Sequence, residues 1–212
     1  MDKKEYWEGR YASEGKIWGE SPSQSAHDAL GLFLANNVKS VLVPGSGYGR
    51  NTRLFSAVGL DVTGIEISET AYKMARQFDP RSKFYLGTVL DMSVDNHRRY
   101  DAIYCFNVLH LFRQQERELF LQQCLGKLQA RGLAFFTVFS NEESTFGQGK
   151  ETEPNTFESK LNRPVHYFTE DDLRRHFHDY KIIEIGTVKD PEDHGGQPHT
   201  HILRYIFVRK TS

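Results

Sequence analysis

Three glycines at alternate positions mark the segment SVLVPGSGYGRN, which spans residues 40–51. Gly45, Gly47 and Gly49 follow a short apolar run, and a helix-like sequence opens at Arg50. Glycine has no Cβ and tolerates positive φ, so such a turn can bend tightly and bring backbone N–H groups against a ligand. The segment predicts a nucleotide-type binding site, with a plain strand-to-helix connection as the alternative.

The spacing of the glycines bears on which nucleotide is bound. Dinucleotide-binding proteins favour G-x-G-x-x-G, whereas this turn reads G-x-G-x-G, with Arg50 where the sixth-position glycine would stand. A second apolar run, residues 60–65, ends at Glu66. A carboxylate at the carboxyl end of the second strand can accept hydrogen bonds from both ribose hydroxyls. Glu66 therefore predicts a ribose contact in any of several cofactor classes, and a solvated loop glutamate is the alternative.

Two later segments narrow the choice. Residues 84–86 read as a third strand followed by GTVLDM, and residues 100–106 read as a fourth strand followed by NVLHLF. In this order, after VPGSGYG, they resemble the corresponding motifs of the class I S-adenosylmethionine (SAM) dependent methyltransferases. That family usually has an acidic residue at the position that Val43 holds here. The resemblance implies that Asp91 bonds the adenine amino group and that the segment beginning at Asn107 lines the methionine and sulfonium end. Asp91 as a surface turn residue and Asn107 as a helix cap are the alternatives.

The N-terminal arm, residues 1–38, is dense in aromatic residues around YWEGRY and KIWGES. These rings either staple the arm onto the core or form a lid over SAM, with Arg10 near its carboxylate. The arm and the following segments resemble the small methyltransferases of the tellurite-resistance and thiopurine type. The SAM-binding residues that we predict are Arg10, Gly45, Ser46, Gly47, Gly49, Glu66, Ile67, Asp91, Met92 and Asn107.

Histidines gather near the C-terminus in DHGGQPHTHILRYI. His199 and His201 alternate along a predicted strand and share one face, and His194 lies across a Gly-Gly turn. H-x-H spacing suits a metal ion, and neutral imidazole can serve as a general base. We predict substrate-facing polar residues first, a metal site second and plain surface histidines third. The catalytic candidates are His199, His201 and, from the end of the fourth strand, His110.

The elements that position these residues follow from periodicity. Helices are predicted over 24–35, 69–78, 115–128 and 170–177, and strands over 41–43, 60–65, 84–86, 100–106, 133–139, 182–188 and 202–208. The resemblance implies an α/β fold with a Rossmann-like sheet of seven strands, the last antiparallel, and helices on both faces. The loop 189–199 would then lie at the cofactor edge. The stretch 140–168 gives no clear element and is typical of a lid or disordered segment on the substrate side. Arg163, His166 and Tyr167 are candidate substrate contacts there, with capping or packing as the alternative.

Composition favours one compact domain over residues 1–212. Hydrophobic residues make up 38% and charged residues 26%, which is ordinary for a globular protein, and no apolar run is long enough to span a membrane. The polar N-terminus is unlike a signal peptide, so we expect a cytoplasmic location. A formal net charge of -1 with dispersed basic residues gives no footprint for nucleic acid. Cys105 and Cys124 are expected as buried free thiols, and the chain is expected to be a monomer or homodimer.

The resemblance implies SAM-dependent methyl transfer to a small-molecule acceptor. A thiol, halide or chalcogen oxyanion would need little or no base, whereas an oxygen or nitrogen acceptor could use His199 or His201. Two alternatives come from other classes, an NAD-dependent oxidoreductase and a noncatalytic SAM-binding module. The glycine spacing and the lack of a Tyr-x-x-x-Lys pair disfavour the first, and the histidine-rich rim disfavours the second.

Overall fold

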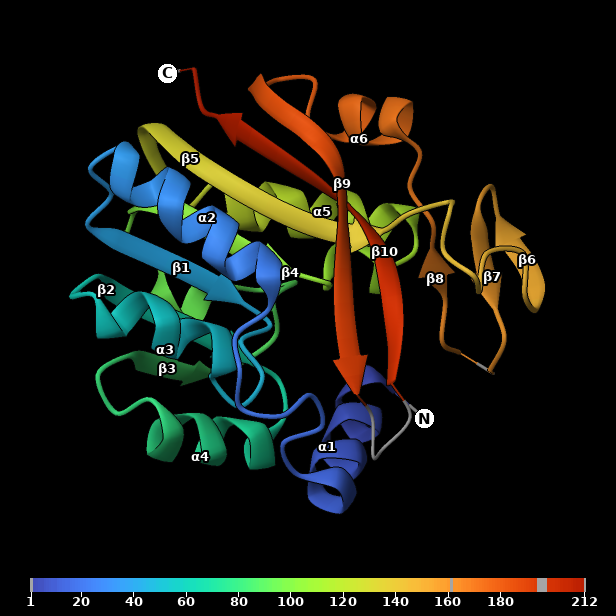
Figure 1. The fold of residues 1–212 in the computed structure, drawn as a ribbon, viewed down its shortest axis with the longest axis horizontal. Helices are drawn as coiled ribbons and strands as arrows, with labels where there is room; N and C mark the ends of the chain where they lie inside the picture. Colours follow the sequence, from blue (N-terminus) through green and yellow to red (C-terminus); the bar gives the residue numbers. More distant parts are fainter. Residues whose placement is uncertain (1, 161, 194–197, 212) are drawn as a thin grey trace.

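Seven strands form the central sheet of the computed structural model, which describes residues 2–160, 162–193 and 198–211 (Figure 1). In sheet order they are β3 (Lys83–Leu86), β2 (Asp61–Glu66), β1 (Ser40–Pro44), β4 (Tyr100–Phe106), β5 (Leu128–Phe139), β10 (Pro198–Arg209) and β9 (Lys181–Asp193). Strands β1 to β5 of this sheet pair in parallel, whereas β10 runs antiparallel to both β5 and β9. The predicted seven-strand sheet with the last strand antiparallel is confirmed.

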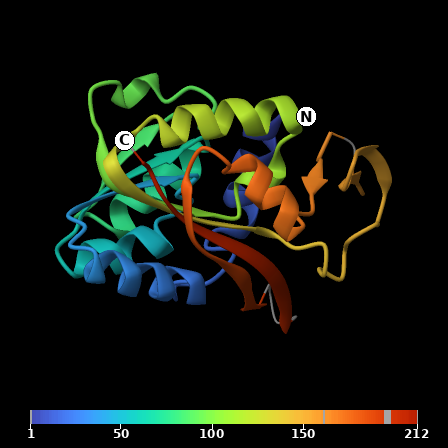
Figure 2. The same ribbon diagram turned by 90° about the horizontal axis from the view of Figure 1, so that it is seen from above.

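Helices cover both faces of the sheet (Figure 2). Helices α2 (Gln24–Ala35) and α3 (Arg50–Ala57) share a core with Val41 and Val43, whereas α5 (Gln114–Leu125) and α6 (Glu170–His176) share one with Leu42. Consecutive residues of β1 thus supply opposite cores, which explains why this strand is apolar without alternation. Helix α4 (Glu69–Phe78) packs on β2 and β3, and α1 (Lys3–Glu14) contacts α4.

The order of the strands along the sheet reverses between β1 and β4, because β2 and β3 lie on one side of β1 and β4 and β5 lie on the other. Ligands of open α/β sheets bind in the crevice beyond the carboxyl ends of the strands at such a point. The glycine turn after β1 and Asn107 after β4 are the segments that leave the sheet there. The topology therefore brings the two predicted halves of the cofactor site to one edge.

The hairpin of β9 and β10 is longer than predicted. The segment 189–199, expected as a loop, is mostly strand, and pairing continues to Pro198 opposite Asp193. Strand β10 pairs with β5 only from Leu203 onward, so the ends of β9 and β10 form a two-stranded ribbon toward α1 (Figure 1). A ribbon beyond the sheet covers no core, so its polar residues give no strand signal. His194 lies outside the described residues.

Two further boundaries differ from the prediction. Helix α5 ends at Leu125, and Leu128 already begins β5, where it pairs with Tyr100. The stretch 140–168, expected without clear structure, contains a small antiparallel sheet of β6 (Lys150–Glu153), β7 (Thr156–Glu158) and β8 (Val165–His166). Strands this short carry too few residues for an alternating pattern to be recognised.

Cys105 and Cys124 are both buried and form no disulfide, as expected. Within the described part of the chain, no helix combines the length and apolar character needed to cross a membrane.

Candidate functional site

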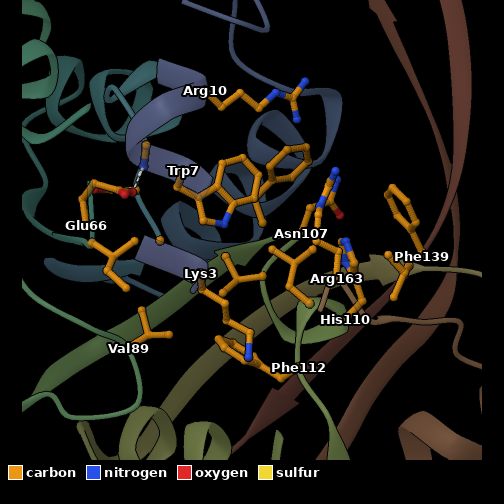
Figure 3. A pocket seen from close by; sticks show the side chains of 18 of the residues that line it. Lys3, Trp7, Arg10, Glu66, Val89, Asn107, His110, Phe112, Phe139 and Arg163 are labelled. Carbon is orange, nitrogen blue, oxygen red and sulfur yellow. Dashed lines mark hydrogen bonds between the residues drawn. The ribbon is translucent and has the colours of Figure 1, made fainter. Parts of the chain in front are cut away.

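A cavity of about 1350 Å³ lies beyond the carboxyl ends of the central strands. Its wall combines the glycine turn, the ends of β2 and β4, helix α1, the insertion after β5 and the β9–β10 ribbon. Figure 3 shows Glu66 and Val89 on one side, Asn107, His110 and Phe139 on the other, and Trp7 between them. This volume exceeds the 300–1,000 Å³ typical of a pocket for one small ligand, so two ligands can fit side by side.

The glycine turn and Glu66 form one hydrogen-bonded unit. Gly47 N donates to Glu66 Oε2 at 2.8 Å, and Ser68 N donates to Glu66 Oε1 at 2.8 Å. Burial raises the pKa of Glu66, although these backbone donors favour the charged form. The carboxylate is 4% exposed and lines the cavity, which fixes a hydrogen-bond acceptor there.

Two of the glycines are required by close contacts. Gly45 has φ of 65°, and a Cβ there would lie 2.5 Å from Val108 Cγ2. Gly47 has φ of 56°, and a Cβ there would lie 3.0 Å from Tyr11 Oη. A side chain would strain the backbone at either position and would collide at the cavity wall. The predicted tight turn is therefore present.

Ser46 adds a polar group to this wall. It is 8% exposed, it lines the cavity, and its Oγ has no hydrogen-bond partner among the described residues. Buried polar atoms are normally paired, so an unpaired hydroxyl on a cavity wall indicates a polar ligand.

The structure brings most of the predicted cofactor residues together. Those that line the cavity are Arg10, Gly45, Ser46, Gly47, Glu66, Ile67 and Asn107. Gly49 is instead the N-cap residue of α3, and Met92 is buried in the core. Asp91 is exposed, and its Oδ1 accepts from Ser93 N at 3.0 Å. Its contact with adenine stays a prediction, while the wall nearby is made by Thr88, Val89 and Leu90.

Helix α1 covers the cavity through an aromatic cluster. Trp7, Tyr11 and Trp18 pack on one another and on Tyr48 beside the glycine turn, with ring centroids 5.9 to 6.3 Å apart. The Arg10 guanidinium lies 5.8 Å from the Trp7 ring and 5.5 Å from the Trp18 ring. The arm is therefore stapled onto the core and forms part of the cavity wall at once.

Glu8 provides a second attachment of α1. Its carboxylate accepts from Thr70 Oγ1 at 2.5 Å, from Ser68 Oγ at 2.7 Å and from Thr70 N at 3.1 Å. Hydrogen bonds from Thr70 hold the pKa of Glu8 down to about 2. A negative group of α1 thus lies at the N-terminus of α4, where the helix dipole favours it.

Arg50 stands where a dinucleotide-binding turn would have its third glycine, and the sequence predicts no contact for it. In the structure its side chain connects three parts of the site. Its Nη1 donates to Trp18 O at 3.1 Å, and its Nη2 donates to Glu192 Oε1 at 3.1 Å. Both side chains of the ion pair are 10% exposed or less. The pair joins α3 to the β9–β10 ribbon across 142 residues of sequence. No local pattern could have indicated this contact.

His199 and His201 lie on one face of the ribbon, as predicted. Their Nε2 atoms are 3.0 Å apart, and His201 Nδ1 lies 3.1 Å from Glu143 Oε1. Burial lowers the pKa of His201, but the hydrogen bond to Glu143 outweighs it and raises the pKa overall. Glu143 also accepts from Ile202 N at 2.7 Å. No motif in the sequence indicates Glu143, which lies in the insertion after β5.

His110 reaches the same end of the cavity from the short helix after β4. Its ring stacks on Phe139 at 4.2 Å between centroids, and Phe139 stacks on His201 at 4.9 Å. Burial lowers the pKa of His110 to about 3, so the imidazole is neutral at physiological pH. Its Nδ1 is buried without a hydrogen-bond partner in the described structure. His110 and His201 therefore stack on the same Phe139 ring, and His199 lies next to His201.

The three residues of the insertion that were predicted to contact the substrate do not lie together in the structure. Arg163 lines the cavity and lies 3.9 Å from the centroid of the Tyr6 ring. His166 is buried between Thr156 Oγ1 at 2.8 Å and Asp172 Oδ2 at 2.5 Å. Its role is to join the small sheet to α6, a packing function that the sequence allowed as an alternative.

Comparison with known proteins agrees with this geometry. Residues 42–136 match the family model of a methyltransferase domain, which includes the glycine turn, Glu66 and Asn107. This part of the chain is therefore similar to a methyltransferase domain, and the predicted resemblance to the class I SAM-dependent methyltransferases is confirmed. A search of curated protein sequences finds no match.

Solved structures share the fold over nearly the whole chain. A protein from a structure on the conversion of a disulfide bond into a thioacetal group during echinomycin biosynthesis is 18% identical, with a TM-score of 0.77, covering 99% of this chain and 92% of that one. The Burkholderia thailandensis 1,6-didemethyltoxoflavin-N1-methyltransferase is 20% identical, with a TM-score of 0.72, covering 99% of this chain and 87% of that one. The CcbJ methyltransferase from Streptomyces caelestis is 16% identical, with a TM-score of 0.74, covering 100% of both chains.

Proposed function

We propose that this protein transfers a methyl group from SAM to a small-molecule acceptor. The observation that carries the proposal is the buried Glu66 carboxylate, which the backbone of the glycine turn holds at the cavity wall. A fixed carboxylate beside a glycine turn is suited to the two ribose hydroxyls of an adenosine cofactor. The methyltransferase domain over residues 42–136 supports SAM as that cofactor.

The residues present fit SAM at this end of the cavity. Glu66 would accept from the ribose, Ser46 Oγ offers an unpaired hydroxyl, and Gly45 and Gly47 leave room for close approach. Bound SAM supplies an electrophilic methyl group on its sulfonium. The chain's own contribution is to hold the donor and the acceptor in line and to exclude water, for which α1 forms the cover.

The acceptor would occupy the end of the cavity near His110, Phe139 and His201. His110 is neutral at physiological pH and can form a hydrogen bond with a polar methyl acceptor. Its low pKa makes it a weak base. A thiol, halide or chalcogen oxyanion needs no stronger one. An oxygen or nitrogen acceptor would rely on the pair His199 and His201.

Isothermal titration of the purified chain tests the cofactor. SAM and its product S-adenosylhomocysteine (SAH) are expected to release or absorb heat on binding, and NAD is not. Replacing Glu66 by Ala deletes charge-assisted hydrogen bonds and is expected to weaken SAH by about 1 to 3 kcal/mol. Glu118→Ala is the matched control, because Glu118 is exposed on α5 and does not line the cavity.

NAD binding without SAM or SAH binding would overturn the proposal in favour of an oxidoreductase. If SAM binds, SAH release is measured against a panel of thiols, halides, oxyanions, phenols and amines. SAM binding with no turnover on any of them would favour the noncatalytic module.

A further inference from the structure

Three side chains of the β9–β10 ribbon converge at the acceptor end of the cavity. His199 Nε2 and His201 Nε2 lie 3.0 Å apart, and Glu192 Oε2 lies 3.7 Å from His201 Nε2. The possible ligand atoms of all three residues lie within 4.8 Å of one another. We propose that Glu192, His199 and His201 bind a divalent first-row transition metal ion.

The separations suit coordination to a single ion. Metal–nitrogen and metal–oxygen bonds at such sites are about 2.0 to 2.2 Å long. With bonds of about 2.1 Å, the 3.0 Å separation gives an N–metal–N angle of about 90°, and the 3.7 Å separation gives an N–metal–O angle of about 120°. Four- and five-coordinate sites use angles of this size, so the three groups need little movement to bind. Two imidazoles and one carboxylate suit zinc or iron(II).

Outer hydrogen bonds already orient two of the three ligands. His201 Nδ1 faces Glu143 Oε1 at 3.1 Å, and the side chain of Glu143 is only 3% exposed. A ligating histidine commonly donates its other ring N–H to a carboxylate, which directs the second nitrogen to the metal. Arg50 likewise holds Glu192 Oε1 at 3.1 Å. This support is independent of the convergence of the ligand atoms.

A histidine pair that only stabilised the hairpin would not need carboxylates around it. One imidazole can donate to the other at 3.0 Å, and Arg50 pairs with Glu192 Oε1, but a hairpin clamp gives no reason for Glu192 Oε2 to face His201 as well. Nor does it require a second carboxylate, Glu143, behind the imidazole that faces Glu192. A metal ion accounts for both acids.

The position of the site indicates what the ion would do. Glu192, His199 and His201 all line the cavity that contains the glycine turn. Three protein ligands leave coordination positions open, and a bound metal lowers the pKa of a coordinated hydroxyl or thiol. Together with the proposed function, this predicts an acceptor that coordinates through oxygen or sulfur. The acceptor loses its proton to solvent and forms its bond to the methyl carbon, while the C–S bond breaks and its electron pair stays on the sulfur of SAH.

Direct metal titration tests the site without relying on turnover. The full chain, freed of any histidine tag and treated with EDTA, is titrated with Co(II), and visible absorption and calorimetry are recorded. Wild type is expected to bind one ion per chain. His199→Gln and His201→Gln are expected to weaken Co(II) by at least tenfold, and Glu143→Gln by about 10- to 100-fold.

His178→Gln is the matched control, because His178 is exposed and pairs with Asp179 away from the cavity. SAH calorimetry on the same samples verifies that each variant is folded. Equal Co(II) binding by wild type and by the variant with both His199 and His201 replaced would overturn the metal site, even if SAH binds normally. Co(II) binding without SAH binding would instead contradict the proposed function and leave the metal site standing.

Discussion

The attachment of α1 through Glu8 can be weakened without changing the shape of the helix. Replacing Glu8 by Gln keeps one carbonyl oxygen for Thr70 Oγ1 but removes the charge. The new amide group cannot accept from Thr70 N, whereas the Ser68 hydroxyl can turn and accept from it. Losing one hydrogen bond and the interaction with the N-terminus of α4 costs about 1 to 2 kcal/mol. A loss of that size increases the open population of the arm by a factor of about 5 to 30.

Hydrogen exchange of residues 3–14, measured with and without SAH, is the assay. Exchange of α1 is expected to rise by that factor in Glu8→Gln, and SAH affinity is expected to fall because α1 forms part of the cavity wall. Glu5→Gln is the matched control: it makes the same change on the same helix, and glutamine also serves at the third position of a capping box.

The pH dependence gives a second reading of the same contact. The folded pKa of Glu8, about 2, lies below its ordinary value of 4.5, so its stabilisation is fully present above pH 4.5 and is lost as the pH falls toward 2. Docking of the arm is therefore expected to survive at pH 4.5. Unchanged exchange of α1 in Glu8→Gln would refute this reasoning and would show that other contacts, such as the aromatic cluster, hold the arm.

Two further predictions concern the cavity wall. Gly45→Ala is expected to lower both the melting temperature and SAH affinity, because its Cβ would lie 2.5 Å from Val108 Cγ2. Gly9→Ala in α1 is the control: its Cβ would meet nothing within 4 Å, and the change is expected to stabilise the fold by about 0.5 to 1 kcal/mol. Equal melting temperatures for the two variants would contradict this geometry. The folded pKa of His110, about 3, lies below its ordinary 6.5, so stability is lost as the pH falls below 6.5. Urea unfolding at pH 7.5 and 5.5 is expected to show a drop about 1.4 kcal/mol smaller in His110→Phe than in wild type, and an equal drop would show that His110 is protonated when folded.

The sequence predicts the parts of this molecule whose signals are local. The apolar run at Val41 to Val43, the glycine turn and Glu66 each depend on residues close together in the chain, and the structure places them as expected. The face shared by His199 and His201 follows from the two-residue period of a strand, which holds wherever the strand ends.

Contacts between distant segments could not be predicted in the same way. Glu143 and His201 are 58 residues apart, and Arg50 and Glu192 are 142 residues apart, so their pairing depends on tertiary packing. The exposure of Asp91 is of the same kind, because the path of the chain after β3 decides which residues face the cavity. A polar residue in a loop has no periodic pattern that reveals its direction.

The cavity wall combines residues inside the segment that matches the family model with residues outside it. The glycine turn, Glu66 and Asn107 lie within the matched domain, residues 42–136, whereas α1, the insertion after β5 and the β9–β10 ribbon lie outside it. The residues proposed to hold the adenosine thus lie inside the matched segment, whereas the proposed acceptor end combines His110 of that segment with the insertion after β5 and the ribbon. Exchanging the insertion and the ribbon between enzymes of this fold is therefore expected to change acceptor selectivity, while the glycine turn and Glu66 stay in place.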